Sequence, residues 1–561
     1  MNTLKQVRGV NAVRASTRYI DRSIALIDIC AVIGVVAVLF TGLVIIKKWP
    51  PIVWVDVVTD DAYYYLGIVR NLIDHGVSAF LPPFSTNGYQ PLWVALLSGS
   101  ASIFGTAEKS LVGQIYALSF LFLLLFCLAS KVRYGMAFPA VAATYYFSYV
   151  TTAGMETSMI PFFFILYTSA RSWPAKGAIG SLLFLSRLDS LSVVVASDVL
   201  GVIQRKDVEF KKYLIILPVI GLYFAINHHY FGTALPVSGL AKSIGNVRGE
   251  NISTGIAYFV EVRKCILPVL LGLLVYLVLI RKSMHLVYRD ELAISLISLI
   301  ICATYYAINS GWKVWGWYYW PVLLFVYYIM LEVVTIIKSQ HAPGKMIPLY
   351  YLFAMIGVIL FLAKPALGFS YRTIQSLRES IVEPHKHLTF GRRNIELISY
   401  LHAQNISPGS FFAMGDRAGS FGFFLGNEYR FIHTEGLVGP YSYYQAMSRD
   451  KGLDFINRLN VNYLVADRGN FIDSDNIIGV VEPVQPLSSK FGDYLLCFKK
   501  DGIALDQSYF NEEHAFQKRY LLDFKERVDC PRSVNDQFVS LRSRYGGIAK
   551  FSGVAPKQPG R

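Results

Sequence analysis

The sequence predicts an α-helical, multi-pass membrane protein that carries a soluble α/β domain at its C-terminus. Of its 561 residues, 54% are hydrophobic and only 16% are charged, which is too apolar for an ordinary soluble protein. Several apolar runs approach the ~20 residues that a helix needs to cross a bilayer. These runs end near residue 363, and the remaining ~200 residues have the size of a globular domain.

The chain begins with a basic leader over residues 1–23, which an apolar run over residues 24–46 follows. This run is too long to be the core of a cleavable signal peptide. Positive charge before the first span predicts that the N-terminus lies in the cytoplasm. The polar segment over residues 47–91 is then expected on the outer side, although Lys47 and Lys48 stand at its start.

Further apolar segments continue the membrane bundle to residue 363. They cover residues 91–105, 110–130, 135–150, 158–170, 177–203, 213–227, 264–280, 291–308, 317–337 and 346–363. Basic clusters between them mark cytoplasmic turns. Keeping every cluster inside requires that one element between residues 91 and 130 does not cross fully, and that the segment 177–203 goes out and back. We therefore predict about eleven spans, with outward loops near Glu156, near Asp189 and over residues 228–262.

The C-terminal part, residues 364–561, is predicted to be an extracytoplasmic α/β domain. A helix is expected over residues 394–404, and short apolar strands over residues 410–414 and 461–466. Cys497 and Cys530 fall in this part. They can form a disulfide if the domain faces an oxidising compartment, but two free thiols fit the sequence equally well.

The charge balance points to lipid and phosphate partners. The chain has 53 Lys and Arg against 38 Asp and Glu, a net charge of +15. Such an excess is also typical of nucleic-acid-binding proteins. In a membrane protein it reflects cytoplasmic loops and contact with anionic head groups, so we expect membrane lipid and no nucleic acid as partner.

One stretch in the first outer segment is too polar to lie in lipid and has too regular a pattern for an irregular connecting loop. Residues 59–93 read TDDAYYYLGIVRNLIDHGVSAFLPPFSTNGYQPLW. Apolar residues recur at the spacing of one helix face, and Gly76 can end the helix. Such a helix would lie along the membrane surface, with Asp60 and Asp61 at its N-terminus beside whatever a lipid carrier presents.

This stretch resembles the GT-C class of polytopic glycosyltransferases. The likeness consists of an acidic pair followed by Ala-Tyr, a short helix that ends in His-Gly, and Gly-Tyr-x-Pro-Leu-Trp at the entry to the next span. The bacterial members that use polyprenyl-phosphate sugars, such as mycobacterial terminal arabinofuranosyltransferases, are most similar. Those chains often carry Glu-Gly-Tyr-Thr-Asn before Pro-Leu-Trp, whereas this chain has TNGYQ over residues 86–90.

The resemblance implies an inverting transfer of a sugar from a polyprenyl-phosphate donor to a glycan, glycolipid or protein acceptor. The reaction would occur on the outer side of the cytoplasmic membrane. It needs a carboxylate that takes the proton of the attacking hydroxyl, and cations that hold the departing phosphate. Asp60 is the first candidate for the base and Asp61 the second. The alternative is that both carboxylates only cap the helix that begins there.

Other candidates for the site follow from the same resemblance. Glu156 lies in Gly-Met-Glu-Thr, similar to the Gly-Leu-Glu-Thr of relatives, and together with Asn87 and Tyr89 is expected to bind the acceptor or a cation. The sequence requires no cofactor, but a divalent cation held by Asp60 and Glu156 remains open. The alternative for Glu156 is a loop residue that caps the next helix.

Four residues are candidates for contacts to the donor. Arg187 and Asp189 interrupt an apolar run, where charges either pair with each other or serve function. Lys242 ends a Leu-Pro-x5-Lys motif like that of relatives and is a candidate phosphate contact. Lys313 stands among the aromatic residues of 309–320, which are either a membrane-boundary belt or a platform for the prenyl chain or sugar.

A transporter or flippase of lipid-linked sugars is the alternative function. It would also be polytopic, basic and rich in aromatic residues. Two features disfavour it: the sequence shows no duplicated halves, and its acidic pair lies in an outer segment instead of mid-span.

Overall fold

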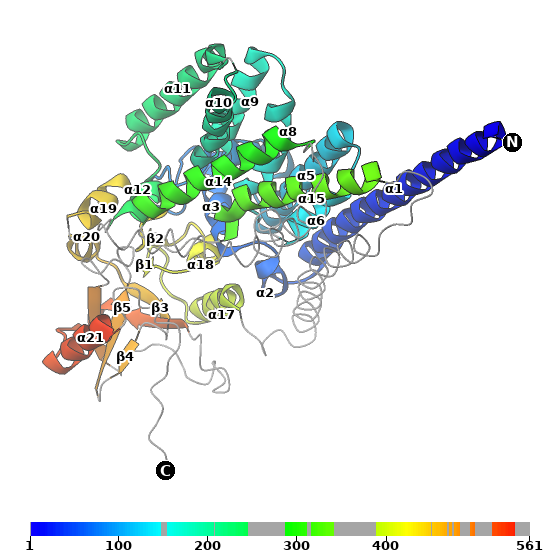
Figure 1. The fold of residues 1–561 in the computed structure, drawn as a ribbon. Coiled ribbons are helices and arrows are strands. Elements are labelled where there is room, and N and C mark those ends of the chain that lie inside the picture. Colours follow the sequence, from blue (N-terminus) through cyan, green and yellow to red (C-terminus); the bar gives the residue numbers. More distant parts are fainter. Residues whose placement is uncertain are drawn as a thin grey trace.

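The fold comes from a computed structural model. It describes residues 2–146, 154–206, 208–244, 287–310, 316–340, 389–449, 451–467, 471–473, 476–482, 494–499 and 519–544. The first part of the chain forms helices, and the part after residue 389 forms a mixed α/β domain below them in Figure 1. The predicted architecture is confirmed at this level.

The helical part begins with one long helix and continues through helices of very different length. In order these are α1 (Asn2–Lys48), α2 (Pro51–Trp54), α3 (Asp60–His75), α4 (Pro91–Phe104), α5 (Glu108–Tyr134), α6 (Phe138–Tyr146), α8 (Ile160–Ser169), α9 (Trp173–Ser186), α10 (Ser192–Ile203), α11 (Tyr213–Phe231), α12 (Val237–Ser243), α14 (Arg289–Asn309) and α15 (Trp320–Gln340). Single turns of 3-10 helix at η2 (Glu156–Met159), η3 (Leu188–Leu191) and η5 (Gly316–Tyr319) lie beside the site described below.

Five helices in the described part of the chain are long and apolar enough to cross a membrane. They are Arg22–Lys48, Glu108–Tyr134, Phe210–Phe231, Arg289–Asn309 and Gly316–Thr335. The predicted number of about eleven spans is therefore not confirmed. Two of the predicted spans, residues 264–280 and 346–363, lie outside the described residues.

Two segments are expected not to cross the membrane once in full, one between residues 91 and 130 and one over residues 177–203, and the helices there are correspondingly short or broken. Helix α4 has 14 residues, about 21 Å of helix against a hydrocarbon core of about 30 Å. The segment 177–203 is broken at Arg187, where α9 ends and η3 begins. Lys176 in the first turn of α9 pairs with Glu209, just after α10, at 3.1 Å. The chain just before the segment and the chain six positions after α10 thus come together, as a segment that turns back at Arg187 requires.

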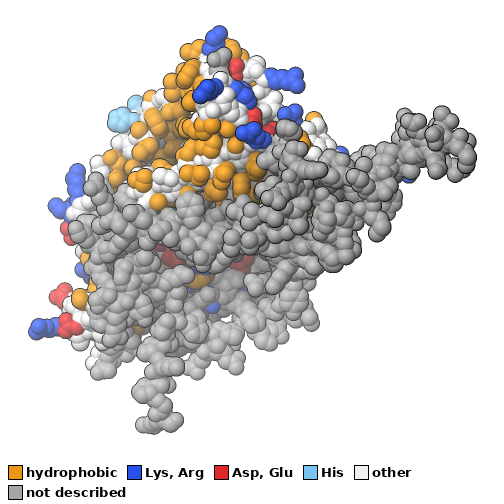
Figure 2. Space-filling view, viewed as in Figure 1, with side chains coloured by type: hydrophobic (Ala, Val, Ile, Leu, Met, Phe, Trp, Pro, Cys, Tyr) orange, Lys and Arg blue, Asp and Glu red, His pale blue; other side chains and the backbone are white. Residues whose placement is uncertain are grey.

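Apolar side chains on the outside of the helical part mark where lipid would lie. Along α11, Leu214, Leu217 and Leu222 are 69%, 59% and 62% exposed. Figure 2 shows apolar side chains over the upper part of the molecule, with Lys and Arg side chains at its upper end. An exposed apolar band of this kind is costly in water and favourable in a bilayer.

Helix α3 confirms the predicted helix in the patterned stretch, but it is more buried than a surface helix. It ends at Gly76, whose φ of 68° is the left-handed conformation that glycine adopts without strain. Residues 62–69 are all buried. Helix α3 packs on α4 and on α18 (Gly419–Leu425) of the C-terminal domain. The helix therefore lies between the two parts of the chain instead of on an open membrane surface.

The C-terminal domain contains two four-stranded sheets. The first has the order β2-β1-β3-β7, in which β1 (Phe411–Met414) runs parallel to β2 (Arg430–His433) and β3 (Tyr463–Asp467), and β7 (Arg519–Asp523) is antiparallel. The second is antiparallel, with β4 (Phe471–Asp473), β5 (Ile477–Glu482), β6 (Tyr494–Lys499) and β8 (Arg527–Val528). Helices α17 (Phe390–Ala403), α18, α19 (Tyr441–Met447), α20 (Gly452–Arg458) and α21 (Arg532–Arg544) complete it.

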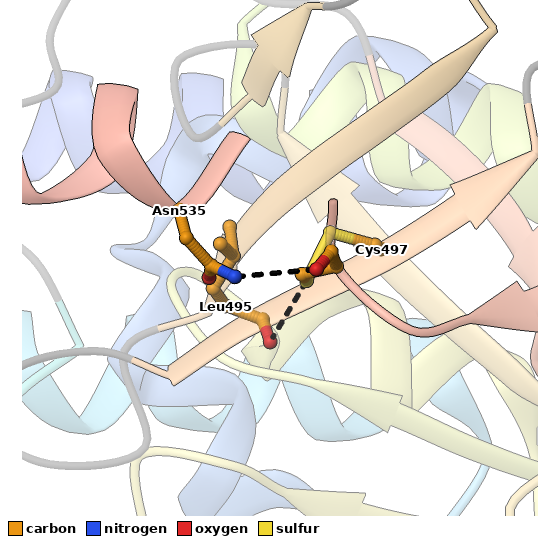
Figure 3. The surroundings of a disulfide bond; sticks show 4 residues. Leu495, Cys497 and Asn535 are labelled. Atoms are coloured by element: carbon orange, nitrogen blue, oxygen red, sulfur yellow. Dashed lines mark hydrogen bonds between the residues drawn. A yellow bond between two sulfur atoms is a disulfide. The ribbon is translucent and has the colours of Figure 1, made fainter. Parts of the chain in front are cut away.

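A disulfide links the second sheet to the segment just before α21. Cys497 in β6 is bonded to Cys530, with Cα atoms 5.2 Å apart, so the alternative of two free thiols is wrong. The Asn535 amide donates a hydrogen bond of 3.2 Å to the carbonyl oxygen of Cys530. Figure 3 shows how these contacts join the start of α21 to the sheet.

Candidate active site

A small polar pocket lies where α3, η2, Arg187, α12 and η5 meet the C-terminal domain. Its volume is about 70 Å³, room for a few water molecules. The lining residues that the structure describes include five of the predicted site residues: Asp61, Tyr89, Glu156, Arg187 and Lys242. Segments more than 350 residues apart in sequence therefore share one site, since Leu437 and Val438 also line it.

The Asp60 carboxylate is hydrogen-bonded to the C-terminal domain through both of its oxygens. Its carboxylate accepts hydrogen bonds from the backbone N–H groups of Gly419 at 2.8 Å and Ser420 at 2.9 Å, and from the Ser420 hydroxyl at 2.5 Å. A Cβ at Gly419 would stand 2.1 Å from the Asp60 carbonyl oxygen, so only glycine permits this approach. Asp60 thus fixes the start of α3 against α18.

Asp61 behaves differently although it is the next residue. Its carboxylate lines the pocket and makes no hydrogen bond to any residue that the structure describes. Burial raises the pKa of Asp61 from its ordinary value of 3.8 to about 7; the charge of Lys242 opposes this shift, and neighbouring carboxylates add to it. A carboxylate with a pKa near neutrality and free lone pairs can take a proton from a hydroxyl that enters the pocket.

Glu156 and Arg187 form the opposite wall. One oxygen of Glu156 accepts a hydrogen bond from the Tyr65 hydroxyl at 2.8 Å, and the other accepts from Arg187 Nη1 at 2.8 Å. Arg187 Nε in turn donates to both oxygens of Asp189, at 2.8 and 2.9 Å, and Asp189 also accepts from the Tyr306 hydroxyl. Glu156 and Arg187 are only 2% and 6% exposed, so this is a buried, mutually compensated network.

A tryptophan of the Pro-Leu-Trp motif holds this wall in place. The indole of Trp93 donates a hydrogen bond of 3.2 Å to the carbonyl oxygen of Gly154. Gly154 has φ of 80°, and a Cβ there would stand 2.9 Å from the Cβ of Ala62. The Gly-Met-Glu-Thr loop can therefore pack directly on α3, which brings Glu156 to Tyr65.

Lys242 supplies a second cation at the pocket. Its ammonium group donates a hydrogen bond of 2.6 Å to the Tyr318 hydroxyl and lies 5.3 Å from the centre of that ring. The Arg187 guanidinium lies 4.4 Å from the centre of the same ring. Tyr318 therefore stands between the two cations. Unlike Arg187, Lys242 has no ion pair within 4.0 Å among the described residues.

Asn87 lies beside the pocket and is engaged in positioning. Its amide donates to Asn227 at 2.9 Å and to the Leu235 carbonyl at 3.1 Å, and its oxygen accepts from Val237 N–H at 3.0 Å. Val237 is the first residue of α12, which carries Lys242. Tyr89 lines the pocket, and its hydroxyl accepts a hydrogen bond of 3.0 Å from Ser78.

Tyr64 connects the pocket to a buried histidine of β2. Its hydroxyl lies 2.9 Å from His433 Nε2, while His433 Nδ1 accepts a hydrogen bond of 3.2 Å from Leu437 N–H. Burial lowers the pKa of His433 to about 3, so its ring is neutral at physiological pH. The pair supports the pocket wall without adding charge.

Asp60 and Glu156, the two residues proposed for a cation, are both engaged in hydrogen bonds. Both oxygens of Asp60 and both of Glu156 already accept hydrogen bonds. Over the ranges that the structure describes, no group of three His, Cys, Asp or Glu side chains is placed to hold a metal ion.

Sequence reasoning found part of this site and missed the tyrosines. Asp189 supports Arg187 from outside the pocket lining, and Lys313 lies outside the described residues. Tyr64, Tyr65 and Tyr318 were missed, because tyrosines at helical spacing or in an aromatic belt are more often core or boundary residues. The available signal was the run of three tyrosines directly after the acidic pair.

Comparisons with known proteins add a weak likeness of fold. No protein-family model and no curated protein matches the chain by sequence. Among solved structures, it is similar to ArnT from Cupriavidus metallidurans bound to undecaprenyl phosphate, with a TM-score of 0.45, 14% identity, and coverage of 78% of this chain and 92% of that one. The structure of the same protein in the apo state matches with a TM-score of 0.44 and 13% identity, and the match covers 78% of this chain and 92% of that one. At these values the function proposed below rests on the site itself.

Proposed function

We propose that this chain is a GT-C glycosyltransferase that moves a sugar from a polyprenyl-phosphate donor to an acceptor hydroxyl. The motif resemblance in residues 59–93 suggests the class, and the geometry around Asp61 supports it. The arabinofuranosyl subtype remains a prediction of the motif alone. The acceptor hydroxyl belongs to a glycan, a lipid or a protein.

The observation that carries the proposal is the contrast between the two adjacent carboxylates. Asp60 has its lone pairs occupied by α18, whereas Asp61 faces the pocket with a pKa of about 7. We therefore assign the base to Asp61, the second candidate from sequence, and a positioning role to Asp60. Asp61 takes the proton of the acceptor hydroxyl as its oxygen bonds to the anomeric carbon.

In the same step the bond between the anomeric carbon and the phosphate oxygen breaks, and its electron pair stays on the phosphate. Lys242 is best placed to stabilise that charge because its only hydrogen bond among the described residues goes to the Tyr318 hydroxyl, and no carboxylate lies within 4.0 Å of it there. Arg187 adds positive potential, but Glu156 and Asp189 already neutralise much of it.

We further propose that the pocket faces the outer side of the cytoplasmic membrane, with the N-terminus inside. Lys176 and Lys206 lie at the end of the α9–α10 pair away from the turn at Arg187, as expected for a cytoplasmic face. The disulfide of the C-terminal domain fits an oxidising compartment outside.

The test is sugar transfer by purified protein in lipid nanodiscs, with a panel of polyprenyl-phosphate sugars that includes the arabinofuranosyl donor. Transfer from one donor that Asp61→Asn abolishes, while donor binding persists, would support the proposal. If no donor is turned over, yet lipid-linked sugar crosses the bilayer equally in wild type and Asp61→Asn, the chain is a transporter instead.

A further inference from the structure

A second cavity, separate from the candidate active site, lies between α1, α4 and α5. Its volume is about 620 Å³, and it shares no lining residue with the pocket at Asp61. The described residues that line it are mostly apolar or small, with two lysines: Leu43, Ile46, Lys47, Ser100, Phe104, Lys109, Ser110, Gly113, Gln114, Ala117, Leu118 and Leu121. We call it the α1–α5 groove.

Both lysines lie at the same end of the helix pair. Helices α1 and α5 run antiparallel, because Lys131 near the end of α5 pairs with Asp28 of α1 at 2.7 Å, while Gly113 near the start of α5 lies beside Leu43 near the end of α1. Lys47 is in the last turn of α1 and Lys109 is in the first turn of α5. They therefore meet at one membrane boundary.

Lys47 and Lys109 lie at the end of the helix pair opposite to the predicted cytoplasmic side, so the positive-inside rule does not explain them. Lys131 and Arg133, at the other end of α5, belong to the basic clusters that mark the cytoplasmic side. Lys47 and Lys109 stand at the opposite boundary, and neither has an acidic partner within 4.0 Å among the described residues. Two uncompensated positive charges above an apolar cavity at the bilayer surface are complementary to an anionic amphiphile.

A buried polar atom supplies a further contact. Gln114 is 8% exposed; its amide nitrogen donates to the Gly105 carbonyl at 2.9 Å and to the Ser110 hydroxyl at 2.9 Å. Its side-chain oxygen is buried and accepts no hydrogen bond in the part of the chain that the structure describes. A hydroxyl of a lipid head group would satisfy this acceptor.

We propose that the α1–α5 groove binds an anionic membrane phospholipid. Its phosphate lies between Lys47 and Lys109, its head-group hydroxyl reaches Gln114, and an acyl chain fills the apolar part beside Leu43 and Leu121. This lipid is distinct from the polyprenyl-phosphate donor, because the donor's phosphate belongs near Lys242 in the other pocket. The groove thus adds a lipid site that the proposed transfer reaction does not require.

Native mass spectrometry of the full chain tests this site, with phosphatidylglycerol, phosphatidylcholine and undecaprenyl phosphate titrated separately. We expect wild type to retain phosphatidylglycerol over phosphatidylcholine. The double substitution Lys47→Gln with Lys109→Gln should weaken that binding by about fivefold for each lysine. Lys48→Gln is the matched control, since this exposed neighbour does not line the groove, and it should bind as wild type.

Gly113→Leu provides an independent variant. A Cβ at Gly113 would meet only Leu43 at 3.9 Å, an ordinary contact, so a side chain can begin there without a close contact to α1. Because Gly113 lines the groove, the added side chain should reduce phosphatidylglycerol binding although both lysines remain. Each variant is compared only if it elutes as wild type in gel filtration. Unchanged phosphatidylglycerol binding in the double-lysine variant, or loss of undecaprenyl phosphate in its place, would overturn the proposal. Transfer activity is not the readout, so this result is independent of the proposed enzyme.

Discussion

The two walls of the candidate active site hold charge in opposite ways. On the wall formed by Glu156 and Arg187, which Asp189 supports from behind, every charge has a close partner of opposite sign, and the network is nearly closed to solvent. On the wall formed by Asp61 and Lys242, the carboxylate has no hydrogen bond to a described residue and the ammonium has only Tyr318. Compensated charges are typical of structure, whereas uncompensated ones are available to a substrate. We therefore assign the first wall to building the pocket and the second to the proposed chemistry.

The strongest test of this division is Asp61→Asn. Removing a general base should lower kcat by about 10²- to 10⁴-fold, because the acceptor hydroxyl then has no group to take its proton. Donor binding, measured by displacement of a labelled polyprenyl phosphate, should change little. Asp60→Asn is the control: it loosens α3 from α18, so its loss of activity should accompany a lower apparent Tm. Equal activity of Asp61→Asn and wild type would remove Asp61 from the mechanism.

Asp61→Asn should lower activity but raise stability above neutral pH, because the pKa of Asp61 is raised in the folded protein. Between the ordinary pKa of 3.8 and about 7, folded Asp61 holds a proton that the unfolded chain has lost. Stability therefore falls as pH rises through this window, and the loss is complete above it. Asp61→Asn should have a higher apparent Tm than wild type at pH 8 and a similar one near pH 4. A lower Tm at pH 8 would contradict the assigned pKa.

Breaking the compensated wall should act on stability first. Arg187→Met leaves Glu156 and Asp189 as buried, uncompensated carboxylates, a change that typically costs about 3–5 kcal/mol. We expect a large fall in apparent Tm in thermal unfolding of the detergent-solubilised protein. Lys242→Met is the matched control from the open wall and should leave the Tm near that of wild type while activity falls. Similar Tm values for both variants would mean that the two walls do not differ as described.

Lys242 also predicts a shift in the pH dependence of transfer. If Asp61 must be ionised, kcat/KM rises with pH and reaches half its plateau near the pKa of about 7. The charge of Lys242 lowers this pKa, so Lys242→Met should move the rise to higher pH in addition to reducing the plateau. Lys206→Met, which is exposed and paired with Asp290 at 3.3 Å, should leave the midpoint unchanged. A midpoint unaffected by Lys242→Met would show that another group titrates.

Local pattern predicted the elements of this site better than their roles. The helix over residues 60–75, its end at Gly76, and the place of Glu156 and Arg187 at the site all follow from motifs within one stretch each. The choice between Asp60 and Asp61 does not, because the groups that occupy Asp60 belong to Gly419 and Ser420, 359 and 360 positions away. A contact at that separation leaves no local trace in the sequence.

For Asn87 too, the sequence predicted that the residue belongs to the site but not what it does there. Its substitution has the smallest expected effect of those considered. It was predicted to bind the acceptor or a cation, but its side chain joins Asn227, Leu235 and Val237 and so places α12. Asn87→Ala should therefore cost about 1–3 kcal/mol of stability from unsatisfied partners. Because Lys242 would then be held less firmly, the KM for the donor should rise more than kcat falls. Donor titration under steady-state conditions separates the two. If Asn87 instead bound the acceptor directly, the KM for the acceptor would change and the KM for the donor would not.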